Sequence, residues 1–221
     1  MDKRQAAAVV TDCARKYENQ LSGTNLMFVA TDKTKYYLME TDYKPQYFFH
    51  LTGLKSIQGE TSYSFYNKCI RGQLRTEDIE LDRTGIAEQK LSVLPQLMDI
   101  AKNARMLGTY NYSKPVLLTD EVVGNNSACM GFRLAEDIYI PNTVLKEDLR
   151  RLTHSVMPVM AVFQKLNTEE QYTSLTYRSK KFFHEQTALP EDIRALLSPQ
   201  LRQDQNLDPP TIFLARTQGR K

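Results

Sequence analysis

The stretch Tyr47–Lys55 reads YFFHLTGLK and brings an aromatic run, a histidine, a hydroxyl and a glycine together. Pro45 stands just before it and ends the preceding run of β-forming residues, because proline restricts its own backbone and that of its neighbour. A short helix is predicted next, and Gly53 stops it, since glycine readily adopts the left-handed conformation found after helix ends. His50 and Thr52 would then lie at a strand-to-helix junction, where a side chain can be held rigidly and face a cleft.

The residues before this stretch predict a helix and a pair of strands. Apolar side chains recur at spacings of three and four over residues 2–21, the pattern of an amphipathic helix, and Gly23 follows its end. Residues 26–31 and 35–41 are rich in β-forming side chains and are separated by a polar turn. We therefore expect two antiparallel strands there.

The residues after the stretch change from a helical to a β-like texture near Met106. Before that point we expect a capped helix, a short helical turn and a longer helix that Pro95 kinks or divides, at residues 63–71, 76–78 and 84–105. After it, the β-like runs are 106–110, 115–118, 128–134, 137–140, 156–165 and 172–178, with helical turns begun by Asn142 or Thr143 at 145–152. The predicted class is therefore α+β, with a helical N-terminal half packed on an antiparallel sheet formed largely by the C-terminal half.

The domain prediction follows from where this pattern ends. We expect one main domain over residues 1–181, because the last β-like run stops near Arg178. Residues 182–221 are expected to form a C-terminal helix, at 190–197, and a tail with prolines and few apolar anchors.

Composition is that of an ordinary globular protein. The chain has 221 residues, 41% of them hydrophobic and 25% charged, which is unlike a disordered sequence. A net charge of +3 permits a nucleic-acid partner without arguing for one. No apolar run approaches the roughly 20 residues that cross a bilayer, so we expect no membrane partner. The three cysteines lack paired spacing, and we expect reduced core thiols in a cytoplasmic protein.

Several familiar catalytic motifs are missing from the sequence. It contains no phosphate-binding glycine loop, no CxxC pair, no HExxH and no GxSxG. No spacing among the acidic residues demands a metal, so we assign no metal and no cofactor. The acidic candidates considered are Asp99, Glu121, Glu136, Asp137, Glu147 and Asp148.

Histidines and cations are what remain for chemistry. His50 is either a hydrogen-bonded core histidine or a site residue, whereas His154 and His184 are expected at the surface. The basic cluster Arg178–Lys181 is followed by two phenylalanines, a combination that suits phosphate and base binding. The alternative for this cluster is a solvated strand end.

Together, these motifs resemble the phage-associated Barnase/EndoU/colicin/RelE-like (BECR) nuclease families, most nearly the fourth phage-associated group. The resemblance spans residues 26–178. The matching pieces are Phe49–Leu54, Phe65–Tyr66, Gly72–Leu74, Thr76–Ile79, Met130–Phe132, Tyr139–Thr143 and Leu145–Leu149.

This resemblance implies a metal-independent ribonuclease-like site on the sheet. In such a site His50 would act as acid or base, Thr143 would donate to phosphate, and Arg178 would supply positive charge. The RNA-binding residues it suggests are Lys165, Lys180, Lys181 and Thr52. The partners it implies are RNA, with transfer RNA and ribosomal RNA as candidates, and an immunity or regulatory protein.

Two functional hypotheses follow. The first is a ribonuclease of a phage or other mobile element, acting as a toxin or conflict factor. The second is a catalytically silent module that binds nucleic acid or protein on the same fold.

Overall fold

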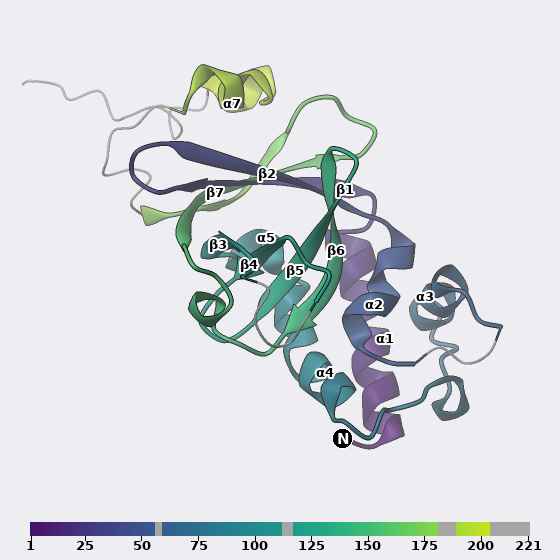
Figure 1. The fold of residues 1–221 in the computed structure, drawn as a ribbon. Coiled ribbons are helices and arrows are strands. Elements are labelled where there is room, and N and C mark those ends of the chain that lie inside the picture. The colour runs from purple at the N-terminus through teal and green to yellow at the C-terminus, as the bar shows by residue number, and fades with distance from the viewer. Residues whose placement is uncertain (56–58, 112–116, 181–188, 204–221) are drawn as a thin grey trace, which may run out of the picture.

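The computed structural model describes residues 1–55, 59–111, 117–180 and 189–203. A helical layer covers one side of an 8-stranded sheet (Figure 1). Its helices are α1 (Lys3–Gln20), α2 (Phe48–Thr52), α3 (Ser62–Ile70), α4 (Ile86–Leu97) and α5 (Ile100–Asn103), and its 3-10 turns are η1 (Pro45–Tyr47) and η2 (Thr76–Asp78). The predicted α+β class is confirmed.

Local sequence explains where the helices begin and end. Asp2 caps α1, and its side chain accepts a hydrogen bond from the Gln5 amide at 2.8 Å. Thr61 caps α3 in the same way through the Ser64 amide. The predicted long helix is divided, but not at Pro95, which lies inside α4: α4 ends at Leu97, and α5 follows as a separate short helix.

The first two strands form the predicted hairpin. Strand β1 (Thr24–Thr31) pairs antiparallel with β2 (Tyr36–Tyr43), with Thr31 opposite Tyr36. Asp32 stabilises the turn by accepting hydrogen bonds from the Thr34 hydroxyl, the Lys35 and Thr34 amides and the Tyr37 hydroxyl. These bonds to its charged form place the Asp32 pKa well below the ordinary value.

The remaining strands complete the sheet. They are β3 (Met106–Thr109), β4 (Glu121–Gly124), β5 (Cys129–Ala135), β6 (Ile138–Leu145), β7 (Met157–Leu166) and β8 (Ser174–Arg178). The hydrogen-bonded order is β1-β2-β6-β5-β4-β3-β7-β8, and β1 also pairs with β7. The order from β1 to β7 therefore closes on itself, with β8 added beside β7.

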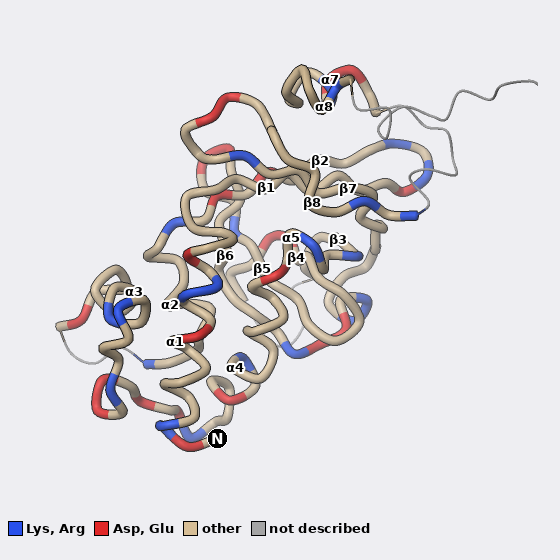
Figure 2. Tube along the Cα trace, turned by 180° about the vertical axis from the view of Figure 1, so that it is seen from behind, with Lys and Arg blue, Asp and Glu red and all other residues tan. Residues whose placement is uncertain are grey.

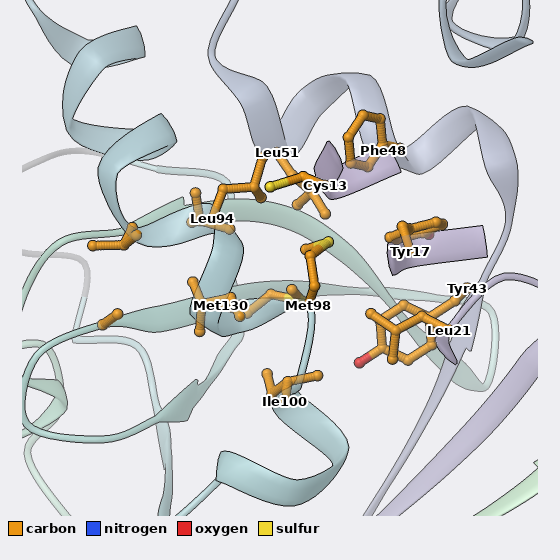
Figure 3. Packing of buried hydrophobic residues seen from close by; sticks show 14 of the residues in the cluster. Cys13, Tyr17, Leu21, Tyr43, Phe48, Leu51, Leu94, Met98, Ile100 and Met130 are labelled. Carbon is orange, nitrogen blue, oxygen red and sulfur yellow. The ribbon is translucent and has the colours of Figure 1, made fainter. Parts of the chain in front are cut away.

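The main core lies between the helices and one face of this sheet, which we call the helix side. Figure 3 shows Cys13 and Tyr17 from α1 packed near Phe48 and Leu51 from α2 and Met130 from β5. Cys13, Cys69 and Cys129 are all free and buried, as the sequence predicted.

Strand β1 is buried on both of its faces. Leu26, Phe28 and Ala30 belong to the main core, whereas Met27 and Val29 belong to a second apolar cluster on the other face. Helices α7 (Glu191–Ala195) and α8 (Pro199–Gln203) cover that second cluster. The helix expected at 190–197 is therefore present, and part of the expected tail is a helix that buries Leu201.

Two strand predictions between residues 115 and 152 are wrong. Residues 117 and 118 of the predicted run 115–118 form no strand, residues 115 and 116 lie outside the described residues, and a strand lies instead at Glu121–Gly124. Pro141 does not end its strand, and Thr143 does not begin helical turns, because β6 continues to Leu145.

Two features of β6 explain why Pro141 does not end this strand: a β-bulge in its pairing with β5 and very little pairing with β2. The pairing of β5 with β6 shifts between Gly131 and Phe132, and β6 pairs with β2 at Tyr139 alone among the described residues. Proline is tolerated where its missing N–H is not needed for a ladder. The helical turn that follows is η3 (Leu149–Arg151), capped by Asp148. No helix in the described residues is long and apolar enough to cross a membrane.

Candidate functional site

The stretch Tyr47–Lys55 forms the predicted junction. Pro45 begins η1, α2 follows directly, and Gly53 ends α2 with a φ of 71°. Phe48 and Leu51 are fully buried in the main core, and the Phe48 ring lies 5.4 Å from that of Tyr17. Most of the motif therefore serves to anchor α2.

Gly53 and Thr52 also have structural tasks. A Cβ at Gly53 would lie 2.7 Å from Lys90 Cδ and 3.2 Å from Ala87 Cα, so glycine allows α4 to approach α2. The Thr52 side chain is fully buried; its hydroxyl donates to Phe49 O at 2.8 Å and accepts from the Leu54 amide at 3.1 Å. In this structure Thr52 therefore presents no hydroxyl to solvent.

His50 is an exposed side chain of the motif. Its ring centroid lies 6.1 Å from that of Phe49, and its backbone carbonyl accepts a hydrogen bond from Lys90 Nζ at 3.2 Å. Burial lowers the pKa of Lys90, whose ammonium caps the end of α2. His50 is thus held on a well-packed helix with its imidazole toward solvent.

Thr143 lies on the face of the sheet opposite to α2. It pairs with Gly131, and the next residue, Val144, belongs to the main core, so Thr143 points away from the helices. Its side chain is 3% exposed, and its methyl carbon would lie 2.8 Å from a Cβ at Gly131. The close packing explains why a glycine stands across from it.

The basic candidates lie on and beyond β7 and β8. Arg178 is the last residue of β8 and pairs with Ala161 on β7. Lys165 lies four residues further along β7 than Ala161, a separation of about 13 Å at the usual rise per residue. Lys165 Nζ donates to Glu170 O at 3.1 Å and lies 5.0 Å from the Tyr172 ring centroid. Lys180 is exposed just beyond β8, and Lys181 lies outside the described residues.

These candidates do not gather around one point. α2 packs against α3, α4 and β6, whereas β8 pairs with β7 and packs against α5. Figure 2 shows α2 and β8 in separate parts of the molecule, with basic and acidic positions interspersed along the chain.

A different group of side chains meets on the helix side of the sheet. Thr109 on β3 pairs with Glu121 on β4, and Glu121 pairs with Phe132 on β5. Two residues further along β5, Leu134 pairs with Tyr139 on β6. Because paired residues, and residues two apart in a strand, share a face, these side chains lie together.

Glu121 is the central residue of this group. Its Oε1 accepts a hydrogen bond from the Thr109 hydroxyl at 2.9 Å, while its Oε2 is buried without a hydrogen-bond partner among the described residues. Burial raises the pKa of Glu121, and the nearby Asp120 charge adds to this rise, while the Thr109 bond opposes it. A buried carboxylate oxygen that accepts no other hydrogen bond is suited to accept a proton.

Tyr139 and Asp120 complete the surroundings. Tyr139 is half-buried, and its pKa is raised by burial and by the charges of Glu121 and Asp120. Asp120 Oδ2 accepts a hydrogen bond from the Leu134 amide at 2.7 Å, which fixes the end of β5 beside it.

Glu121 is one of the acidic candidates in the sequence, but its spacing from the others assigned it no role. Its partners stand 12 residues before it and 18 residues after it, at Thr109 and Tyr139, so no local spacing signals the group. The register of β3 to β6 is what brings them together.

The comparisons with known proteins bear on the fold as a whole. A family model described as phage-Barnase-EndoU-ColicinE5/D-RelE like nuclease 4 matches residues 10–181. The comparison with curated proteins and the comparison with solved structures each found no match.

Proposed function

Because the chain belongs to the phage-Barnase-EndoU-ColicinE5/D-RelE like nuclease 4 family, we propose that it cleaves RNA by acid/base transesterification without a metal ion. In such a reaction a base removes the proton of a 2′-hydroxyl, and the freed oxygen attacks the adjacent phosphorus. An acid then protonates the departing 5′-oxygen. The cellular setting we propose is the cytoplasm of a host in conflict with a phage or other mobile element.

The observation that carries this proposal is the carboxylate of Glu121. One of its oxygens is held by Thr109, and the other is buried without a partner. An unused acceptor on a carboxyl with a raised pKa is what a general base requires. We assign the base role to Glu121.

His50 and the basic residues keep secondary roles in the proposal. His50 is exposed, and histidine side chains often serve as general acid or base, so it is the second candidate for either role. Arg178, Lys165 and Lys180 would contact RNA phosphates along β7 and β8. Thr143 is 3% exposed, so a phosphate contact from it requires the sheet to move.

The test compares RNA cleavage by the wild type and by Glu121→Gln in the presence of a metal chelator. The glutamine keeps the shape and the Thr109 bond but cannot take a proton, so we expect cleavage to fall by about 10²-fold or more. Glu80→Gln, an exposed glutamate on another surface, is the matched control and should cleave normally. His50→Ala, measured in parallel, reports on the second candidate.

Stability separates lost chemistry from lost folding. A carboxyl whose pKa is raised by folding binds more protons in the folded state, so its ionisation costs stability as pH rises above the ordinary value. Glu121→Gln removes this cost. We therefore expect the variant to be at least as stable as the wild type at pH 7, with the difference gone near pH 4.

Each outcome has a definite meaning. Unchanged cleavage by Glu121→Gln removes that residue from the mechanism, and a loss confined to His50→Ala moves the proton role to α2. Salt-dependent RNA binding without cleavage by the wild type would favour the silent binding module.

A further inference from the structure

An exposed apolar surface adjoins Glu121 on the same face of the sheet. Leu134 is 46% exposed, although the residue two positions before it, Phe132, is fully buried in the main core. Tyr139 lies directly across from Leu134 on β6 and packs one part of its ring against that core. The two side chains therefore form an apolar surface that extends from the core into solvent, and we call this surface the step.

The position of this step is fixed by hydrogen bonds. The Leu134 amide donates to Asp120 Oδ2 at 2.7 Å, and the Asp120 amide donates to Phe132 O at 2.8 Å. Asp120 immediately precedes Glu121, so the step and the proposed base are joined through two adjacent residues of one segment. A group bound on the step would lie beside the carboxylate.

The electrostatics of Tyr139 argue against a role as proton donor. Burial and the charges of Glu121 and Asp120 raise the pKa of its phenol, which makes it a weaker acid. What Tyr139 offers is an uncharged ring with one part on the core and the rest toward solvent.

We propose that Leu134 and Tyr139 form a platform for an unpaired nucleobase, so that the site takes single-stranded RNA. This inference rests on the proposed nuclease function. Bases stack on aromatic side chains with little dependence on sequence, and a base inside a duplex has both faces covered by its neighbours. The platform therefore selects single-stranded segments and places the ribose of the stacked nucleotide beside Glu121.

The test measures binding rather than cleavage. The probe is a single-stranded oligonucleotide of about ten residues whose 2′-hydroxyls are replaced by 2′-methoxy groups, which cannot undergo transesterification. Its affinity for the full chain is compared with that of the same strand annealed to its complement. We expect the single strand to bind about tenfold more tightly or better.

Variants locate the binding surface. Tyr139→Ala and Leu134→Ser should each weaken single-strand binding, the first by about tenfold, whereas Tyr139→Phe keeps the ring and should bind like the wild type. The matched controls are Tyr63→Ala and Ile86→Ser, which alter side chains 56% and 51% exposed on the helical layer and should have no effect.

Equal affinity for single strand and duplex, wild-type binding by Tyr139→Ala, or a loss in Tyr139→Phe as large as in Tyr139→Ala would each overturn the platform. None of these results depends on cleavage. Lost RNA cleavage by Glu121→Gln would still support the nuclease even if the platform failed. Selective binding of the single strand would likewise still support the platform if Glu121→Gln cleaved RNA normally.

Discussion

Gly53 shows how one residue sets the distance between two helices. Its left-handed backbone ends α2, and its missing side chain makes room for the Lys90 stem and the Ala87 backbone of α4. Lys90 then reaches the His50 carbonyl and caps α2. The glycine therefore holds together the segment that carries His50.

We expect Gly53→Ala to destabilise the protein by about 2–3 kcal/mol, because it adds a steric conflict to an unfavourable φ. The control is Gly85→Ala, where φ is 76° but no atom lies within 4 Å of the added carbon. That change should cost only about 1 kcal/mol. Chemical denaturation of both variants gives the comparison, and equal losses would show that α4 does not press on Gly53.

For single residues, the sequence predicted the place in the fold better than the function. The junction around His50 and the stop at Gly53 are as expected, because proline and glycine act locally. The burial of Thr52 could not be predicted, since the elements that pack against α2, namely α3, α4 and β6, come later in the chain. A role for Glu121 could not be predicted for a similar reason, because its partners lie on other strands.

Among the elements, α7 shows most directly how the C-terminal region is attached. Ile193 is fully buried on α7 and belongs to the cluster that covers Met27 and Val29 of β1. These contacts bury the second face of the central strand. The predicted boundary at residue 181 thus separates parts of one apolar cluster.

We expect Ile193→Ala to lower the free energy of unfolding by about 2–5 kcal/mol, because it leaves a cavity against the sheet. Asp192→Ala, at an exposed position one residue before, should change it by no more than about 0.5 kcal/mol. Urea unfolding of the full chain measures both. A loss from Ile193→Ala as small as that of the control would mean that residues after 181 are not part of the folding unit.

Elements with strong local signals were predicted well, and those fixed by pairing were not. The amphipathic α1 and the β1–β2 hairpin need only periodicity and a turn. Strand β4 is four residues long, and β6 runs through a proline, so both depend on neighbours that the sequence does not reveal.

For the whole molecule, two joins in the ring of strands are short among the described residues: β3 meets β7 at two residue pairs, and β2 meets β6 at one. β1 pairs with β2 and β7 along its length, but β2 and β6 meet through Thr41 and Tyr139 alone among the described residues. Local opening costs least where few backbone bonds must break. The join between β2 and β6 should therefore open far more often than β1 separates from its neighbours.

Hydrogen exchange can test this difference. We expect the amides of Leu26–Ala30 to exchange slowly, and that of Tyr139 at least about a hundred times faster, because only one residue pair joins β6 to β2 among the described residues. Tyr139 is also half of the proposed nucleobase platform, so a bound single strand should slow exchange at Tyr139 while leaving β1 unchanged. Exchange as slow at the join as in β1 would mean that the ring opens only by global unfolding. The platform would then be rigid before RNA arrives.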